Sequence, residues 1–355
     1  MPMTNETPRT STAPATDEWV TLLCDNARTG GQGAPPMEAP SRARWQLRLG
    51  SSVRSAPVMR DTTLYVNSLA GTLHAINVET GRLKWKFQAP GQIHSTPSLY
   101  KNKVLFGCDD GNVYAVNAEL GGKSWDVPTK GEVWASPVVR QGVACFGSAD
   151  GHVYAADADS GKLVWKQRLG GRVYSTAYAA EKNIYVGSGD GHVHSLDQTT
   201  GKILWSTPTG NGIDSSPALV RDTLVIGSLD FFVYGLDAST GAVRWKYETG
   251  LGISSSPAVS GDVAYIGSKD GFLYALAIKT GELKWKTRAG EVVTSPLVFS
   301  EGVVYVQSFG TMALEAATGN VMWRAGLGGS VQGAPVIRER VIYVAGNSGE
   351  VYALE

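Results

Sequence analysis

The chain has 355 residues, a formal net charge of zero and 43 glycines. A neutral chain without a basic stripe argues against a nucleic-acid partner. No run approaches the roughly eighteen apolar residues of a membrane-spanning helix, so no membrane span is expected either.

The N-terminal region differs in composition from the rest of the chain. Residues 1–15 are rich in Thr, Pro and Ser, and we expect them to form a disordered tail. Residues 16–43 are expected to be a leader segment that packs on the main domain, with a turn or two of helix near residues 17–23. The tail has neither the apolar stretch of a secretory signal nor a lipidation cysteine after one, so we expect a cytoplasmic protein.

From residue 44 to the end, the chain consists of repeats of about forty residues. Tryptophans recur forty residues apart, with one interval of thirty-eight, at Trp45, Trp85, Trp125, Trp165, Trp205, Trp245, Trp285 and Trp323. A proline in a small-residue setting keeps step with them at Pro57, Pro97, Pro137, Pro217, Pro257, Pro296 and Pro335, and Ala177 replaces it in the fourth repeat. Two independent markers with one period indicate a repeat fold.

Each repeat predicts four short strands. In residues 251–290 these strands are 253–259, 263–267, 272–277 and 282–288. Turns that contain Gly and Asp, which tolerate positive φ, separate the strands. Four antiparallel strands per repeat are typical of a propeller blade. We therefore predict that residues 44–355 form an all-β, eight-bladed β-propeller.

The predicted ring closes through its two ends. A signature Ala-x-Asp-x-x-Thr-Gly-x-x-x-Trp leads into the tryptophans, as in residues 197–205, and the chain stops at Glu355 where this signature begins. Trp45 has no such strand before it, so residues 44–49 are predicted to supply the outer strand of the last blade. The alternative is an open seven-bladed ring. The repeated tryptophans are expected to be structural and to pack between blades, each with a partner for its N–H.

The signature, with Ser-Ser-Pro at 215–217 and Gly-Ser-x-Asp at 227–230, resembles the quinoprotein (PQQ-like), BamB-like β-propeller repeat family. The resemblance covers residues 45–355, and residues 19–30 resemble the leader of soluble bacterial members. It implies two functional branches: quinone-dependent dehydrogenases, which hold PQQ with calcium, and the BamB-type outer-membrane assembly scaffold. Because the chain has no adjacent cysteines, export signal or large inserted loops, we expect no cofactor and disfavour PQQ with calcium.

Function is expected where equivalent positions of the repeats differ, because the shared residues are needed for packing. The position four before the proline is always Val or Ile and is predicted to be buried. Three before it stand Arg54, His94, Trp134, Tyr174, Asp214, Ser254, Val293 and Gln332. Five before it stand Ser52, Gln92, Glu132, Arg172, Gly212, Gly252, Glu291 and Ser330. The loop between the second and third strands carries Leu69, Asp109, Ala149, Gly189, Leu229, Lys269, Phe309 and Asn347.

The resemblance implies that the first strand lines the axial channel, so these residues would ring one channel mouth. Arg54 and Asp214 would face each other across the axis, with His94 between Arg54 and Trp134. Arg54 would hold an anionic or carbonyl group, and Trp134 would be a stacking wall. The proton-transfer candidates are His94, Tyr174 and Asp214. Further substrate-binding candidates are Gln332, Glu132, Arg172 and Phe309.

These residues favour a monomeric propeller that binds a small organic molecule at the axial mouth, with a cofactor-independent isomerase, cyclase or lyase of a biosynthetic pathway as its enzymatic form. Three alternatives stay open: a BamB-like scaffold that binds a protein segment, a solvated mouth with a structural Arg54–Asp214 ion pair, and a quinone-dependent dehydrogenase. No metal site is predicted, because His152, His192 and His194 are spread over two blades. The scattered cysteines, Cys24, Cys108 and Cys145, are expected to be reduced and mostly buried.

Overall fold

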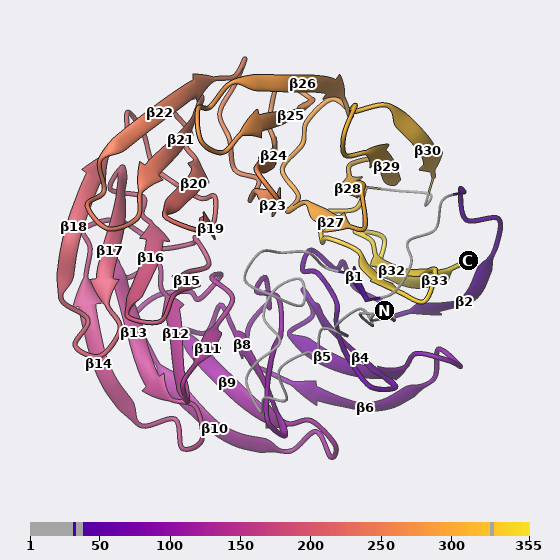
Figure 1. The fold of residues 1–355 in the computed structure, drawn as a ribbon. Helices are drawn as coiled ribbons and strands as arrows, with labels where there is room; N and C mark the ends of the chain where they lie inside the picture. Colours follow the sequence, from indigo (N-terminus) through magenta and orange to yellow (C-terminus); the bar gives the residue numbers. More distant parts are fainter. Residues whose placement is uncertain (1–30, 33–37, 327–329) are drawn as a thin grey trace, which may run out of the picture.

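The computed structural model describes residues 31–32, 38–326 and 330–355. In these ranges the regular structure is entirely β, and eight sheets form a ring around one axis (Figure 1). The described residues contain no helix that could cross a membrane. The expected disordered tail and the helical turn near residues 17–23 lie outside the described residues.

Blades 1 to 7 each contain four consecutive antiparallel strands. Blade 1 contains β3 (Val58–Arg60), β4 (Thr63–Ser68), β5 (Thr72–Asn77) and β6 (Leu83–Gln88); blade 2 contains β7 (Ser98–Tyr100), β8 (Lys103–Gly107), β9 (Asn112–Asn117) and β10 (Lys123–Pro128). Blade 3 contains β11 (Val138–Arg140), β12 (Val143–Gly147), β13 (His152–Asp157) and β14 (Leu163–Arg168); blade 4 contains β15 (Tyr178–Ala179), β16 (Asn183–Gly187), β17 (His192–Asp197) and β18 (Ile203–Pro208). Blade 5 contains β19 (Ala218–Val220), β20 (Thr223–Gly227), β21 (Phe232–Asp237) and β22 (Val243–Glu248). Blade 6 contains β23 (Ala258–Ser260), β24 (Val263–Gly267), β25 (Phe272–Ala277) and β26 (Leu283–Arg288); blade 7 contains β27 (Val298–Ser300), β28 (Val303–Gln307), β29 (Thr311–Glu315) and β30 (Val321–Ala325).

Blade 8 closes the ring by joining the N-terminal part of the described chain to the C-terminus. Its strands are β31 (Val336–Arg338), β32 (Val341–Ala345), β33 (Glu350–Leu354) and, as the outer strand, β2 (Ala43–Arg48). β2 runs antiparallel to β33 with Trp45 opposite Ala353, and Arg44 forms an ion pair with Glu355. The predicted closure by residues 44–49 is confirmed.

A fifth strand covers the axial edge of blade 8. β1 (Gly31–Gln32) pairs in parallel with β31, with Gly31 opposite Ile337. β31 is the innermost strand of its blade, so β1 lies on the channel side of it (Figure 1). The inner edge of this blade is therefore paired, which protects it from association with another chain.

The first strand of blade 6 is shorter than predicted. In blade 6 it comprises Ala258–Ser260, whereas the alternation predicted 253–259; the other three strands agree to within one residue. Ser255 Oγ donates to the carbonyl of Gly267 and accepts its N–H, which replaces backbone ladder bonds at this point. Pro257 has no N–H to contribute. The variable positions before the proline therefore lie in an irregular segment that leads into the strand.

Near the axis, successive blades are linked by backbone-to-hydroxyl hydrogen bonds. The N–H of the residue before the proline donates to the hydroxyl of the equivalent residue in the next blade. These bonds run from Ala56 to Thr96, Thr96 to Ser136, Ser136 to Thr176, Thr176 to Ser216 and Ser216 to Ser256. They explain why small hydroxyl residues accompany the proline in the repeat.

At the perimeter, the residues of the signature make one blade-to-blade contact. The N–H of Trp205 donates to the carbonyl of Ala238 in the next blade at 3.1 Å. Asp237 accepts the N–H of Thr240 and shapes the turn that places Gly241, at φ 76°, against the indole ring. Equivalent indole bonds, each reaching a carbonyl thirty-three or thirty-one residues later, are made by Trp45, Trp85, Trp125, Trp165, Trp245 and Trp285.

Two of the three cysteines lie in the described residues. Cys108 and Cys145 are buried free thiols, as predicted, and burial raises the pKa of each to about 12. Cys24 lies outside the described residues. At neutral pH the two described thiols are protonated, so they pack as small apolar groups.

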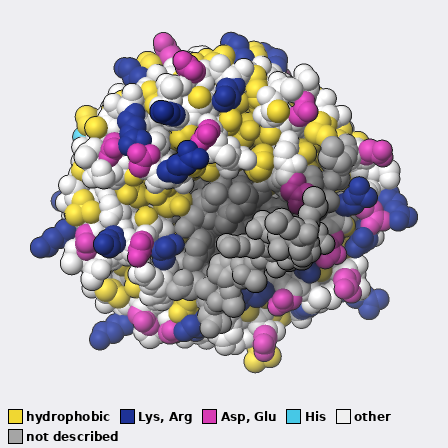
Figure 2. Space-filling view, viewed as in Figure 1, with side chains coloured by type: hydrophobic (Ala, Val, Ile, Leu, Met, Phe, Trp, Pro, Cys, Tyr) yellow, Lys and Arg dark blue, Asp and Glu magenta, His cyan; other side chains and the backbone are white. Residues whose placement is uncertain are grey.

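The surface carries both signs of charge. On the face seen in Figure 2, Lys and Arg side chains alternate with Asp and Glu side chains, and hydrophobic side chains lie between them. This mixture agrees with the zero net charge of the chain.

The perimeter contact predicts that alanine substitution destabilises the protein much more at Gly241 than at Gly261, although the two glycines have similar φ. A Cβ at Gly241 would lie 2.6 Å from the Trp205 ring, whereas one at Gly261, at φ 55°, would meet nothing within 4 Å. In both alanine variants the free energy of unfolding should fall by about 1 kcal/mol, because positive φ disfavours alanine. In Gly241→Ala the free energy of unfolding should fall by about 2 kcal/mol more, because the Trp205 indole must move. Chemical denaturation measures both, and equal losses would contradict the proposed role of the contact.

Candidate functional site

One end of the ring, which we call the mouth face, is built from two kinds of segment. These are the loops between the second and third strands and the irregular segments that precede the first strands. Backbone bonds join them: Asp109 N–H donates to the Gln92 carbonyl at 2.9 Å, and Leu229 N–H donates to the Gly212 carbonyl at 3.1 Å. Both sets of variable positions therefore lie on one face, as predicted.

The central feature of the mouth face is a stack of three rings from adjacent blades. His94 of blade 2 stacks on Trp134 of blade 3, and Trp134 stacks on Tyr174 of blade 4, each pair with ring centroids 4.5 Å apart. The guanidinium of Arg172 lies 5.1 Å from the centre of the Tyr174 ring. Since both faces of the Trp134 indole contact another ring, a ligand ring would join this stack at its His94 end.

Asp109 anchors the stack from the neighbouring loop. Its carboxylate accepts the indole N–H of Trp134 at 2.9 Å and lies 3.5 Å from Nε2 of His94. From the sequence, Asp109 was expected on this face, but no role was predicted for it. The signal was available, because Asp109 is the only acidic residue among the eight that occupy this loop position.

Burial and nearby charges shift the pKa of the two titratable rings of the stack, His94 and Tyr174. Burial lowers the pKa of His94; Asp109 and Glu132 oppose this shift, and Arg54 adds to it. Burial also raises the pKa of Tyr174, and the negative charges of Glu132 and Asp214 add to that shift. At pH 7 the His94 imidazole is therefore neutral and the Tyr174 phenol is protonated. Arg54 and Asp214 do not form an ion pair in the described residues.

The predicted register in blade 7 was wrong by one residue. Val293 was assigned to the mouth, but it is fully buried and would contact a Cβ at Gly267, as Ile253 would at Gly227. Val292, predicted to be buried, is exposed, and Thr294 takes the mouth position. The error arose because Pro296 stands one residue earlier in its repeat than the other prolines. By the same shift, Val292 rather than Glu291 takes the position equivalent to Gly252 in blade 6.

A second group of predicted residues lies across the mouth, on blades 7 and 8. Gln332 and Phe309 line a cavity of about 230 Å³ together with Val292 and Thr294. Phe309 is 70% exposed. The structure thus divides the candidate residues into an aromatic stack on blades 2 to 4 and an apolar group beside Gln332.

Phe231 has an unusual backbone conformation on this face. It stands at φ 80°, where the equivalent loop position holds glycine in Gly111, Gly151, Gly191 and Gly271. The other seven described non-glycine residues with positive φ lie in turns between first and second strands, at the opposite end of the blades. A left-handed conformation costs a bulky residue about 1–2 kcal/mol. Phe231 is nevertheless 42% exposed, so its ring is only partly packed against the protein.

The quinoprotein resemblance raises the question of whether a metal-held quinone fits the mouth. Such a group needs several carboxylate or histidine ligands that converge on one point. In the described ranges, no three His, Cys, Asp or Glu side chains are arranged to hold a metal ion. The described residues therefore do not fit a quinone bound through a metal.

Ring and mouth together define an eight-bladed β-propeller with a candidate binding surface at one end of its axis. A family model described as outer membrane protein assembly factor BamB matches residues 38–133, 109–252 and 230–355. The chain belongs to this family.

Solved structures show the same architecture. BamB from Moraxella catarrhalis superposes with a TM-score of 0.75 at 19% identity, covering 88% of this chain and 99% of that one. The computationally designed Ika8 protein superposes with a TM-score of 0.78 at 17% identity, covering 90% of this chain and 99% of that one. Quinohemoprotein alcohol dehydrogenase from Comamonas testosteroni superposes with a TM-score of 0.78 at 18% identity, covering 97% of this chain and 81% of that one. A search of the curated proteins found no match. Identities this low show a shared fold alone.

The electrostatics of the stack predict opposite responses to two substitutions. Asp109→Asn removes a negative charge that favours the imidazolium, so the pKa of His94 should fall further. Arg54→Gln removes a positive charge that disfavours the imidazolium, so the pKa of His94 should rise. An NMR titration of His94, assigned with a His94→Gln variant, measures both. A wild-type pKa above that of free histidine, or shifts of reversed sign, would contradict this geometry.

Proposed function

We propose that this protein is an interaction scaffold that binds a partner protein through the mouth face. Large apolar side chains are exposed there on four blades: Trp134, Phe231, Leu251, Val292 and Phe309. Aromatic side chains that become buried at an interface contribute about 2 kcal/mol or more each, and Trp, Tyr and Arg dominate such contacts. The stack of Arg172, Tyr174 and Trp134 supplies these residue types in one place.

The observation that carries this proposal is the strain at Phe231. Glycine would adopt φ 80° without a steric cost, and the equivalent loops use it. A phenylalanine in that conformation costs stability in the free protein, and the exposed part of its ring gains no burial there. Contact with a partner supplies the missing compensation, since strained residues cluster at functional sites. The family description, an assembly factor for outer membrane proteins, also supports a role that involves other proteins.

Phe231→Gly should therefore separate stability from binding. The free energy of unfolding should rise by up to about 1 kcal/mol, because relief of strain exceeds the entropy cost of glycine. Capture of the partner from the native cells, quantified by mass spectrometry, should fall at least tenfold, and it should also fall for Phe309→Ser.

Leu120→Ser is the matched control. Leu120 is 81% exposed in the β9–β10 turn, at the opposite end of the blades from the mouth face. This variant should capture the partner as well as wild type does. If all three variants retain the same partners, or if only Leu120→Ser loses them, the mouth face is not the docking surface.

A second function is favoured by the environment of His94. A neutral imidazole, held between Asp109 and Trp134 beside Arg54, is suited to accept a proton from a bound small molecule. In this role Arg54 holds an anionic or carbonyl group, while Tyr174 and Asp214 serve as donor and base at the far end of the stack. The reaction would be an isomerisation, cyclisation or elimination.

Alanine substitutions at Arg54, His94 and Asp214 test this second role. They should abolish binding of ligands found in a thermal-shift screen of metabolite-sized compounds, without lowering the melting temperature and without affecting partner capture. Unchanged ligand binding in all three variants would eliminate the small-molecule role and leave the scaffold role intact.

Three earlier expectations stay predictions: a cytoplasmic location, a monomeric state and independence from a cofactor. Cell fractionation and light scattering of the purified protein test the first two. Supplying PQQ with calcium and a dye acceptor tests the third, and a thermal shift with dye reduction would contradict it.

A further inference from the structure

In four blades, an aspartate and a tyrosine fill the space between the loop after the second strand and the segment before the first strand. In blade 6, Asp270 accepts the N–H of Gly250 at 2.8 Å and the hydroxyl of Tyr274 at 2.6 Å. The equivalent acid–phenol pairs are Asp110 with Tyr114, Asp150 with Tyr154 and Asp230 with Tyr234. A carboxylate and an aromatic ring are thus standard occupants of this space.

Blade 7 lacks both groups. It is two residues shorter in this loop, where Phe309 and Gly310 replace the aspartate-containing turn. Met312 pairs with Val306 as Tyr274 pairs with Ile266, so a methionine stands where the tyrosine should be. The N–H of Gly290, the counterpart of Gly250, donates instead to the Gly271 carbonyl at 3.2 Å.

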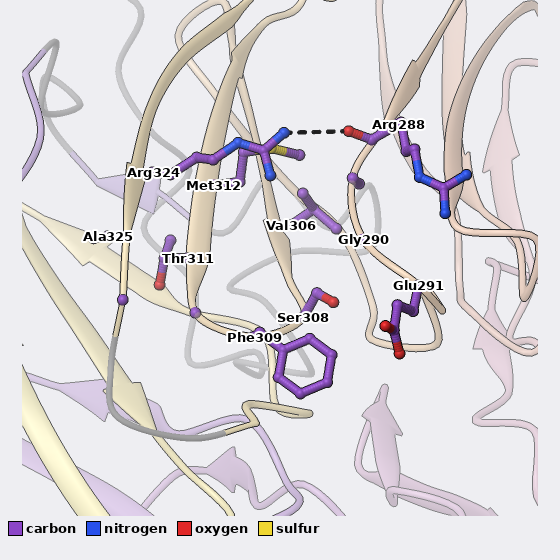
Figure 3. Close-up of a pocket in the computed structure, with 13 residues that line it drawn as sticks. Arg288, Gly290, Glu291, Val306, Ser308, Phe309, Thr311, Met312, Arg324 and Ala325 are labelled. Atoms are coloured by element: carbon purple, nitrogen blue, oxygen red, sulfur yellow. Dashed lines mark hydrogen bonds between the residues drawn. The ribbon is translucent and has the colours of Figure 1, made fainter.

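The missing groups leave a cavity of about 490 Å³ between blades 6 and 7, which Figure 3 shows in close-up. Blade 1 also lacks the aspartate, but there Gln88 fills the gap by donating to the carbonyls of Ala70 and Ala89. In blade 7 the equivalent space stays open. Val306, Met312 and Phe309 form its apolar wall.

Two arginines line the same cavity without an acidic partner. Arg324 reaches across it and donates to the backbone carbonyl of Arg288 at 3.3 Å (Figure 3). Arg288 lies over the Phe272 ring, 5.7 Å from its centre. Neither guanidinium takes part in an ion pair within the described part of the chain, although Glu291 also lines the cavity. An arginine has five donors, and within the described residues Arg324 uses one nitrogen, which donates to the carbonyl of Arg288.

We propose that this cavity binds a small carboxylic acid with an apolar, ring-sized body. The carboxylate replaces the missing aspartate and is held by Arg324, with Arg288 adding positive charge. The apolar body replaces the missing tyrosine ring and packs on Met312, Val306 and Phe309. The cavity lies within the size range of small-molecule sites, which combine apolar walls with a few polar groups. This inference concerns a site separate from the stack and does not depend on the scaffold role.

Calorimetric titration of the full chain with 3-phenylpropionate tests the proposal, and the neutral 3-phenylpropanamide is the matched probe. The acid should bind at least tenfold more tightly than the amide. Arg324→Gln should weaken binding of the acid at least tenfold, since it removes the charge-assisted hydrogen bond. Met312→Tyr should abolish binding by refilling the cavity, while its melting temperature stays at or above that of wild type.

Lys246→Gln is the control variant. Lys246 follows Trp245 in blade 5 as Arg324 follows Trp323 in blade 7, but it does not line the cavity. This variant should bind the acid as wild type does. The proposal is overturned if the acid does not bind wild type, if acid and amide bind equally, or if Arg324→Gln or Met312→Tyr leaves binding unchanged.

Discussion

The contact between a tryptophan and the next blade is the interaction on which the rest of this ring depends. A single four-stranded sheet has two faces and buries neither alone, so each blade is stable only against its neighbours. The indole N–H of Trp205 fixes the distance to blade 5 through the Ala238 carbonyl, and Gly241 provides the space for the ring. Because every blade needs this contact on both sides, the ring must close. Trp45 closes it by joining β2 to the C-terminal strand while donating to Val78 in blade 1.

The contacts that hold the blades together leave the side chains of the mouth face free to vary. Hydroxyl and indole bonds hold the blades from the axis and the perimeter, and neither set uses the side chains at the mouth. The mouth can therefore carry a stacked His94, Trp134 and Tyr174 on one side and exposed apolar groups on the other. Phe231, at φ 80°, is one such variable residue, and its backbone conformation lowers the stability of the free protein. The cavity in blade 7 arises in the same way, from a loop that lost its aspartate.

The markers that repeat were sufficient to predict the fold, because packing requires them at a fixed period. The eight tryptophans predicted the blade number, and the position of Trp45 predicted closure. The site was predicted less completely. Pro296 shifted the alignment by one residue and hid Thr294, since only burial shows that Val293 points inward. The role of Asp109 depends on which side chains of blades 2 and 3 meet in space. The conformation of Phe231 and the open cavity beside Met312 follow from backbone geometry that residue types alone do not specify.

The central claim is that the mouth face, and not the opposite end of the ring, meets a partner. The most direct test is photo-crosslinking in the native cells, with a photoreactive amino acid in place of Phe231 in one variant and in place of Leu120 in another. Our account predicts a discrete crosslinked protein from position 231 and none from position 120. Crosslinks confined to position 120, or the absence of any from position 231, would contradict it.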